Sequence, residues 1–337
     1  MRAVGYKKSL PIEQAESLID LDIEKPAPQG RDLLVQVKAI SVNPVDTKVR
    51  KRAAPKDGEP PKILGYDATG VVAAVGPDAT LFKPGDEVWY AGSIVRPGTN
   101  SEFHLVDERI VGKKPKSLGF AAAAALPLTS ITAWEMLFDR FAVARGGGEG
   151  KSLLIVGGAG GVGSIAIQLA RTLTKLTVIA TASRPETQSW CKKLGAHHVV
   201  DHSKPMAEQL KERGHRFVDY IFGVTQSDQH FDTIVDAIAP QGKFGLIDDP
   251  KPLDTSRFKG KSASVHWEAM FTRSTFQTPD MEEQHRLLSE VARMVDDGTI
   301  RTTVQENLGV INATNLRRAH AMIESGRTRG KIVLEGF

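Results

Sequence analysis

The sequence has 337 residues, of which 41% are hydrophobic and 25% charged, the composition of a globular protein long enough for about two domains. The 44 basic and 40 acidic residues are interspersed and leave a formal net charge of +4, so neither nucleic acid nor a membrane surface is indicated as a partner. Cys191 is the only cysteine, which excludes an intrachain disulfide and a cysteine-rich metal cluster. The N-terminus has no secretory apolar region, and no stretch approaches the roughly 20 apolar residues of a membrane span, so we expect a cytoplasmic protein.

The N-terminal part of the chain is rich in strand patterns separated by turn signals. Lys83-Pro-Gly-Asp86 and the segment 96–100 are two such turns, and they alternate with apolar segments such as 32–40 and 68–76. This pattern predicts a β-rich, barrel-like domain over residues 1–127. Small and apolar residues from 121 to 141 predict a buried helix at its end.

Beyond Lys151 short apolar strands alternate with helical patterns, which predicts an α/β class with a doubly wound parallel sheet over residues 128–272. The predicted strands are 153–156, 176–180, 198–200, 218–222 and 243–247, and 262–267 is a candidate sixth. The C-terminal segment 273–337 contains two helical patterns and a final strand at 331–335. We expect this segment to return to the first domain.

A glycine-rich turn follows the first strand of the predicted parallel sheet. Gly158, Gly160 and Gly163 satisfy G-x-G-x-x-G between a strand and a helix, the context in which this motif binds a dinucleotide. We expect the first glycine to permit the tight turn, the second to let the pyrophosphate approach, and the third to let the helix pack on the strand. The predicted cofactor-binding residues of the turn are Gly158, Ala159, Gly160, Gly161, Val162 and Gly163. The alternative is a glycine-rich loop without a ligand, but five glycines in seven residues would then cost backbone entropy without return.

The end of the second predicted strand indicates which dinucleotide binds. An acidic residue about 20 positions beyond the glycines would bind the ribose 2′-hydroxyl of NAD, and none is present there. Ser183 and Arg184 instead offer a hydroxyl and a guanidinium to a 2′-phosphate, which favours NADPH. Ser183 to Glu186 also reads as a helix capping box, and Arg184 as a solvated surface charge, so these roles stay open.

Motifs along nearly the whole chain resemble the medium-chain dehydrogenase/reductase superfamily, especially its quinone oxidoreductase-like branch, some members of which are called zinc-type alcohol dehydrogenase-like proteins. The motifs, besides the glycine turn, are Val42-Asn-Pro-Val-Asp46, Ile63-Leu-Gly-Tyr-Asp67, Phe82-Lys-Pro-Gly-Asp-Glu-Val88, Leu126-Pro-Leu-Thr-Ser-Ile-Thr-Ala-Trp134 and Gly330-Lys-Ile-Val-Leu334. The resemblance implies a Rossmann doubly wound sheet plus a GroES-like, β-rich catalytic domain completed by the C-terminus. It also implies a cofactor held between the two domains, and a homodimer.

The sequence departs from the zinc enzymes of this superfamily at the positions where they hold metal. Asn43 stands where they have their first cysteine ligand, and Tyr66 replaces the histidine of their Gly-His-Glu motif. The lobe with four cysteines is missing, and Cys191 is far in sequence from either site. Zinc prefers cysteine, histidine or carboxylate ligands in a tetrahedral arrangement, so we expect no metal site.

Without a Lewis acid, a conjugated acceptor is easier to reduce than an isolated ketone, because conjugation spreads the developing negative charge. We therefore expect NADPH-dependent hydride transfer to a small-molecule quinone or α,β-unsaturated carbonyl. By analogy with related reductases, Asn43, Asp46, Tyr66 and Thr129 would line the nicotinamide and substrate end. Tyr66 is the candidate hydrogen-bond donor to the substrate oxygen, with an aromatic wall as the equal alternative, and Asp46 is better suited to hold a loop.

Four further residues are candidates for the cofactor site. His202 occupies a place where relatives use a residue near the adenosine phosphate, although a surface histidine is an equal reading. Val224, Ile247 and Phe271 are predicted to follow strand ends at the cofactor cleft, with a core role as the simpler account of each. The competing functions are a zinc-type alcohol dehydrogenase acting on alcohols or aldehydes and, from another class, an NADPH-binding protein without catalysis. Nucleic-acid binding has no support, because no basic cluster with interleaved aromatic residues is present.

Overall fold

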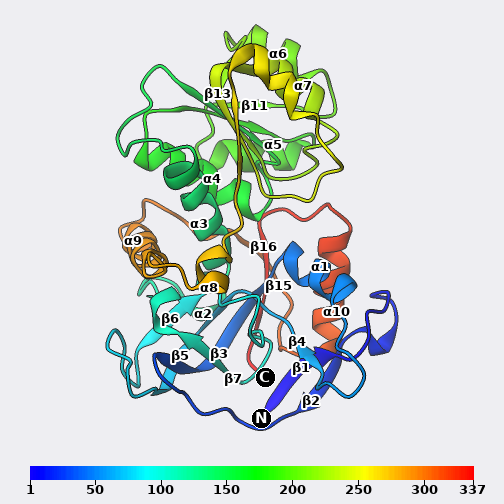
Figure 1. Cartoon of the computed structure of the whole chain (residues 1–337), viewed down its shortest axis with the longest axis vertical. Helices are drawn as coiled ribbons and strands as arrows, with labels where there is room; N and C mark the ends of the chain where they lie inside the picture. Colours follow the sequence, from blue (N-terminus) through cyan, green and yellow to red (C-terminus); the bar gives the residue numbers. More distant parts are fainter. The chain divides into compact units, whose positions relative to one another are not determined.

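The computed structural model describes all 337 residues, and the chain divides into two compact units (Figure 1). Unit 1 combines Met1–Ile131 with Phe271–Phe337, and unit 2 is Thr132–Met270. The two chain ends both belong to unit 1, where the Arg2 guanidinium lies 5.9 Å from the centre of the Phe337 ring.

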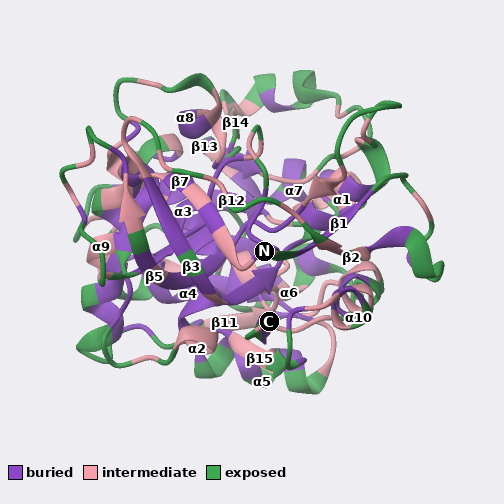
Figure 2. Ribbon diagram, turned by 90° about the horizontal axis from the view of Figure 1, so that it is seen from below, coloured by how far each residue is buried: buried purple, intermediate pink, exposed green.

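Unit 1 is built on a seven-stranded, mainly antiparallel sheet in which the C-terminal strand is an integral member. The order is β15-β16-β3-β5-β6-β8, with β7 also paired to β3, and a separate sheet has the order β2-β1-β4. The strands are β1 (Arg2–Tyr6), β2 (Ile19–Asp22), β3 (Asp32–Val42), β4 (Lys62–Ile63), β5 (Ala68–Val75), β6 (Glu87–Tyr90), β7 (Phe103–Asp107), β8 (Val111–Lys113), β15 (Val304–Asn307) and β16 (Lys331–Glu335). Figure 2 shows β3 at the buried centre of this sheet. The GroES-like, β-rich prediction is confirmed.

The pairing of β16 with β3 brings the two ends of the sequence together. The strands are antiparallel with Ile332 opposite Val42 and Leu334 opposite Ile40. Lys331 therefore lies beside the end of β3, where the chain continues into Asn43. The helices of unit 1 are α1 (Pro44–Arg52), α2 (Phe120–Ala124), α3 (Pro127–Trp134, which continues into unit 2), α8 (Thr272–Phe276), α9 (Glu283–Asp296) and α10 (Ala313–Glu324). Figure 1 shows α1 beside α10, and the two helices are in contact.

Unit 2 contains a parallel sheet of six strands in the order β11-β10-β9-β12-β13-β14. Counted along the unit, this is the order 3-2-1-4-5-6 of a dinucleotide-binding Rossmann fold. The strands are β9 (Ser152–Val156), β10 (Thr177–Thr181), β11 (His198–Val200), β12 (Val218–Gly223), β13 (Ile238–Leu246) and β14 (Ser264–Trp267). The doubly wound prediction is confirmed, and so is the sixth strand.

Four helices of unit 2 alternate with these strands: α4 (Gly161–Leu173), α5 (Pro185–Lys193), α6 (Met206–Glu212) and α7 (Phe231–Ala237). Residues Gly163–Ala170 of α4 are all buried, so its middle turns are packed on nearly all sides. Val162 and Leu173, near the two ends of α4, are only half-buried.

The predicted helix at 121–141 is interrupted. α2 ends at Ala124 and α3 begins at Pro127, because a proline disfavours helical geometry in the residue before it. After Trp134 the helix widens to π geometry over Glu135–Arg140.

The helical run Phe120–Arg140 also corrects the expectation about membrane-spanning length. By length and composition this run of 21 residues could cross a membrane. However, 78% of its most apolar window is buried inside the structure, and core helices of soluble proteins pass the same test. The run is therefore weak support for a membrane span.

Candidate active site

The glycine turn of unit 2 lies between β9 and α4, and different steric constraints require glycine at its different positions. Gly157 has a φ of +89°, so the tight turn falls on this residue and not on Gly158 as predicted. A Cβ on Gly158 would lie 2.7 Å from the Ala180 Cβ, so Gly158 is required by close packing against β10. A Cβ on Gly163 would lie 2.4 Å from the Gly157 carbonyl oxygen, which confirms close contact between helix and turn.

Gly160 differs from the other motif glycines because a Cβ there would meet nothing closer than the Gly157 carbonyl oxygen at 3.7 Å. The chain itself therefore does not require glycine at this position. Gly160 also precedes the first turn of α4, where backbone N–H groups lack partners within the helix and attract anions. An open approach to free N–H groups is what a pyrophosphate needs.

Two of the predicted cofactor residues join the glycine turn at the carboxyl edge of the sheet. Val224 directly follows β12, and its N–H donates to the Val156 carbonyl at 3.1 Å. Ile247 directly follows β13, and its N–H donates to the Gly223 carbonyl at 3.3 Å. Ligands of open parallel sheets bind outside this edge, so the placement suits contact with a cofactor.

A hydrogen-bonded chain connects the glycine turn to His202. The Gly157 N–H donates to the Thr181 hydroxyl oxygen at 2.9 Å, and that hydroxyl lies 3.2 Å from the His202 Nδ1. The Thr181 hydroxyl therefore bridges the Gly157 backbone and the His202 ring. The His230 ring lies 5.9 Å from that of His202, and burial lowers the pKa of both histidines.

Ser183 and Arg184 lie at the predicted place, between β10 and α5, but the helix cap is shifted by one residue. Arg184 is the N-cap, and its N–H donates to the Thr187 hydroxyl at 3.2 Å, so the predicted Ser183–Glu186 capping box is wrong. The Arg184 guanidinium lies 3.2 Å from a Glu186 carboxylate oxygen, and both side chains are substantially exposed. Solvent weakens such a pair.

In unit 1, Asn43 and Asp46 form the start of α1 and are fully buried. One carboxylate oxygen of Asp46 accepts the Asn43 N–H at 2.7 Å, and the other accepts the Gly65 N–H at 2.9 Å. Asp46 thus ties the loop before α1 to the loop that carries Tyr66, as expected of a loop-holding residue. Burial raises the pKa of Asp46 to about 7, although these N–H donors and the charge of Lys331 act in the opposite direction.

A buried ion pair lies beside Asn43. The Lys331 ammonium donates to an Asp67 carboxylate oxygen at 2.9 Å and to the Asn43 side-chain oxygen. The Asn43 amide nitrogen donates to the same Asp67 oxygen at 2.8 Å, and the Leu128 N–H donates to the other at 2.8 Å. Burial raises the pKa of Asp67, against the lowering effects of Lys331, Asn43 and Leu128.

Tyr66 lies between Gly65, which is hydrogen-bonded to Asp46, and Asp67. Its side chain is 1% exposed, its hydroxyl has no hydrogen-bond partner within the chain, and its ring meets Phe271 edge-on. Burial raises the pKa of the Tyr66 phenol, and the Asp46 charge raises it further, so the hydroxyl keeps its proton and is a donor. Thr129 is buried in the first turn of α3 and donates its own proton to the Leu126 carbonyl at 3.1 Å.

The structure therefore groups the predicted residues by unit. Asn43, Asp46 and Tyr66 belong to one buried cluster of unit 1, to which Thr129 connects through its neighbour Leu128. Phe271 also belongs to unit 1, whereas the other predicted cofactor residues belong to unit 2. Sequence reasoning missed Asp67 and Lys331 as members of this cluster. Both lie inside the quoted motifs, but their pairing depends on the register of β16 against β3, for which neither residue carries a local signal.

Two family models match parts of the chain. Residues 29–126 match the alcohol dehydrogenase GroES-like domain family, and residues 194–334 match the zinc-binding dehydrogenase family. A zinc-type alcohol dehydrogenase-like protein of Staphylococcus aureus (strain MSSA476) is 41% identical over 99% of both chains. The chain belongs to the medium-chain dehydrogenase/reductase superfamily.

Solved structures of this superfamily agree in fold over the full length. A putative zinc-dependent alcohol dehydrogenase of Rhizobium etli CFN 42 has a TM-score of 0.96 and 61% identity, covering 100% of this chain and 98% of that one. The quinone oxidoreductase of Pseudomonas syringae pv. Tomato DC3000 has a TM-score of 0.83 and 27% identity, covering 99% of each chain. Mycobacterial Rv1454c, solved with NADPH, has a TM-score of 0.84 and 26% identity, covering 99% and 100%. This superfamily member is an oxidoreductase that uses a nicotinamide cofactor.

The residues of this superfamily member do not fit a zinc ion at the positions where zinc enzymes bind one. No group of three or more His, Cys, Asp or Glu side chains in the structure is arranged to hold a metal. Asn43 is bonded to Lys331 and Asp67, and Tyr66 is a protonated phenol. Cys191 belongs to unit 2, where burial raises the pKa of its thiol to about 12, so the thiolate needed for zinc is disfavoured.

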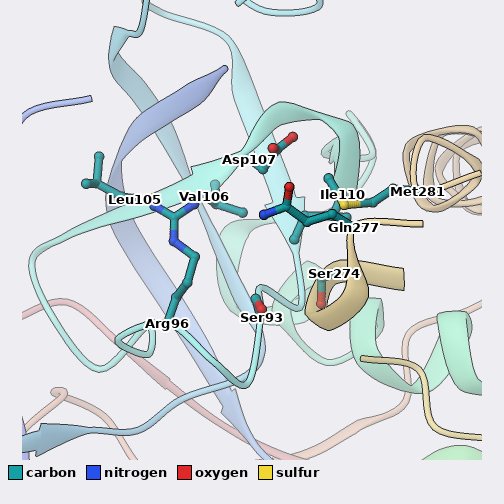
Figure 3. Close-up of a pocket in the computed structure, with 9 residues that line it drawn as sticks. All are labelled: Ser93, Arg96, Leu105, Val106, Asp107, Ile110, Ser274, Gln277 and Met281. Carbon is teal, nitrogen blue, oxygen red and sulfur yellow. The ribbon is translucent and has the colours of Figure 1, made fainter. Parts of the chain in front are cut away.

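A separate cavity of unit 1 lies beside α8 and has a volume of about 40 Å³, room for about three water molecules. It is lined by Ser93, Arg96, Leu105, Val106, Asp107, Ile110, Ser274, Gln277 and Met281. Figure 3 shows the Gln277 amide directed toward the side of the cavity on which Arg96 lies. The Arg96 guanidinium is already paired with both carboxylate oxygens of Asp32, and the cavity is too small for a quinone or a nicotinamide. It is not the substrate site.

Proposed function

We propose that the protein is an NADPH-dependent oxidoreductase that transfers hydride, without zinc, to a quinone or an α,β-unsaturated carbonyl. In this proposal the Rossmann unit holds the cofactor through the glycine turn, Val224 and Ile247. The β-rich unit supplies the substrate end through Asn43, Asp46, Tyr66, Thr129 and Phe271. The predicted boundaries of the catalytic domain, 1–127 with 273–337, are part of the same proposal.

One observation carries the metal-free part of the proposal: the side chain at the first zinc-ligand position is held by an ammonium group. The Asn43 side-chain oxygen accepts from Lys331, and its amide nitrogen donates to Asp67. A metal cation at that oxygen would face the charge of the ammonium, and an amide is not among the ligands that zinc prefers. With no Lewis acid to neutralise an alkoxide, an acceptor that spreads negative charge by conjugation is favoured.

The choice of NADPH is supported by the end of β10, at Thr181. No acidic residue stands there for a ribose 2′-hydroxyl, whereas Ser183 and Arg184 follow one residue later. The His202 ring, held by the Thr181 hydroxyl, offers a further polar group near the neighbouring strand end. Arg184 must leave Glu186 to bind a phosphate, and the exposed pair makes that inexpensive in free energy.

The residues of unit 1 have distinct roles in this proposal. When bound, the nicotinamide supplies the hydride. The Tyr66 hydroxyl donates a hydrogen bond to the substrate oxygen as negative charge develops there. Phe271 fixes the Tyr66 ring, and Asp46 fixes the backbone of both loops. Asn43 is enclosed by its own partners, so it acts through the position of Lys331 and Asp67 and not by contact with the substrate.

The test is an NADPH-oxidation screen of 1,2- and 1,4-quinones, linear enones and aldehydes, run with and without chelator on protein whose metal content is measured. We expect turnover of conjugated acceptors that chelator does not change. NADH in place of NADPH gives the cofactor preference. Stoichiometric zinc, with activity lost on chelation and restored by zinc, would overturn the proposal.

A zinc-type alcohol dehydrogenase is the second candidate, because the 61% identical solved relative is described as a putative zinc-dependent alcohol dehydrogenase. Under that function, alcohols would be oxidised in a zinc-dependent reaction and quinones would be poor substrates. The same screen separates the two. We also propose a homodimer acting on small molecules, an expectation that light scattering after size-exclusion chromatography tests directly.

A further inference from the structure

The charge at the centre of the unit 1 cluster comes from the last strand of the chain. Lys331 opens β16, and its side chain is 4% exposed while that of Asp67 is fully buried. Asp67 and Lys331 are 264 positions apart in sequence. A buried ammonium is costly unless paired and hydrogen-bonded, and Lys331 meets both conditions through Asp67 and Asn43.

The ammonium holds together segments that carry the candidate site. Asn43 precedes α1, and Asp67 directly follows Tyr66. The second Asp67 oxygen accepts the Leu128 N–H, in the first turn of α3 and next to Thr129. One cation therefore fixes the entry to α1, the Tyr66 loop and the start of α3.

Two buried carboxylates face this single ammonium. Asp67 contacts it directly, and Asp46 lies near enough that the Lys331 charge lowers the pKa of Asp46 while the Asp67 charge raises it. Asp46 in turn raises the pKa of the Tyr66 phenol. The effect of Lys331 on Tyr66 is thus indirect. Lys331 fixes the position of Asp67, which is next to Tyr66, and its charge acts on Asp46, whose own charge acts on the Tyr66 phenol.

We propose that Lys331 is a positioning residue of the active site, a built-in cation that occupies the place between Asn43 and Asp67 and holds Tyr66 and Thr129 for reaction. The proposal rests on the proposed function for its kinetic part. It predicts that removal of the side chain leaves a site for a small primary ammonium ion, because the two acceptor oxygens remain and only the donor is lost.

The first experiment is chemical rescue of K331A. We expect kcat to fall by about 10- to 100-fold, because Tyr66 would be displaced from its position for reaction, with little change in the Kd of NADPH. Ethylammonium should restore kcat and thermal stability in a saturable way, whereas tetramethylammonium, which has no N–H, and zinc should not. K113A is the matched control, because Lys113 is an exposed lysine at the end of β8 in the same unit.

The second experiment separates positioning from mere folding. K331M removes the charge that lowers the pKa of Asp46, so the pH dependence of kcat should move to higher pH, while K331R should keep the original profile. If K331A and K331M do not fold, D67N/K331M removes both charges together, a change that buried pairs tolerate. This variant should fold and keep a lowered kcat.

Two results would overturn the inference: wild-type kcat in K331A or in folded D67N/K331M, or a folded K331A whose loss no primary amine reverses. The proposed function fails separately, if the unmodified protein reduces no acceptor with NADPH. In that event the effect of ethylammonium on the thermal stability of K331A still decides whether Lys331 fills an ammonium site.

Discussion

The ring of Phe271 meets the ring of Tyr66 edge-on, with the centroids 5.3 Å apart and the planes at 68°. Phe271 is the first residue of unit 1 after the chain leaves unit 2, so this contact anchors the return of the chain on the candidate donor. The ring of Tyr66 is fixed by packing, while its hydroxyl has no partner within the chain. That separation lets the hydroxyl be removed without loss of a native hydrogen bond.

Tyr66→Phe should therefore lower kcat without lowering stability. If the hydroxyl donates to the developing oxyanion, kcat should fall by the order of 100-fold, with an unchanged melting temperature and an unchanged Kd for NADPH. Tyr90→Phe is the control, since the Tyr90 hydroxyl lies 3.2 Å from His104 Nδ1 and its loss should cost stability but not kcat. Full activity of the Tyr66 variant would leave Tyr66 as an aromatic wall.

Arg184→Ala should weaken NADPH binding by the order of 10- to 100-fold and NADH binding much less, because a charge-assisted bond to the 2′-phosphate is lost. Glu186→Gln is the informative partner, since it removes the carboxylate charge that pairs with Arg184. We expect it to tighten NADPH binding a few-fold, as exposed pairs are weak. Fluorescence titration with both cofactors measures the effects. Equal losses for NADPH and NADH in Arg184→Ala would contradict the 2′-phosphate role.

The glycine turn yields a prediction that separates folding from binding. Gly163→Ala places a Cβ 2.4 Å from the Gly157 carbonyl oxygen and should destabilise the fold by about 1–3 kcal/mol. Gly160→Ala meets nothing closer than 3.7 Å and should keep the wild-type melting temperature. It should nevertheless lose most cofactor affinity, because its methyl group would lie in the approach to the free N–H groups of α4. Normal NADPH binding by Gly160→Ala would show that the pyrophosphate lies elsewhere.

The parts of the fold that were predictable are those encoded locally. The β9 strand, the glycine turn and α4 follow one another in sequence, so periodicity and glycine spacing were sufficient. Cap positions were harder: Ser183 with Glu186 and Arg184 with Thr187 are both compatible spacings, and the chain uses the second. The Asp67–Lys331 pair could not be derived at all, because it depends on the register of β16 against β3. Neither residue has a local signal for its partner.

His320 gives the chain a built-in sensitivity to acid. It is fully buried in α10, neither ring nitrogen has a hydrogen-bond partner, and burial lowers its pKa from 6.5 to about 3. Because the folded-state pKa is depressed, the unfolded chain binds a proton that the folded chain rejects. The contribution of neutral His320 to the free energy of unfolding is therefore fully present above pH 6.5 and is lost as the pH falls toward 3. Asp46 has the opposite effect on stability. Burial raises its pKa to about 7, so its contribution to the free energy of unfolding falls as the pH rises from about 4 to 7.

His320→Leu should remove the acid sensitivity that comes from this one group. At pH 5 the proton penalty amounts to about 2 kcal/mol, so the stability of the variant relative to wild type should be greater at pH 5 than at pH 8 by about that amount. At pH 8, where the histidine is neutral in both states, the difference should shrink to the effect of removing two unpartnered nitrogens. Urea unfolding at both pH values measures this stability difference. The effect of Asp46 on stability cancels, because Asp46 is present in both proteins. An equal stability difference at pH 5 and pH 8 would mean that His320 takes up its proton in the folded chain.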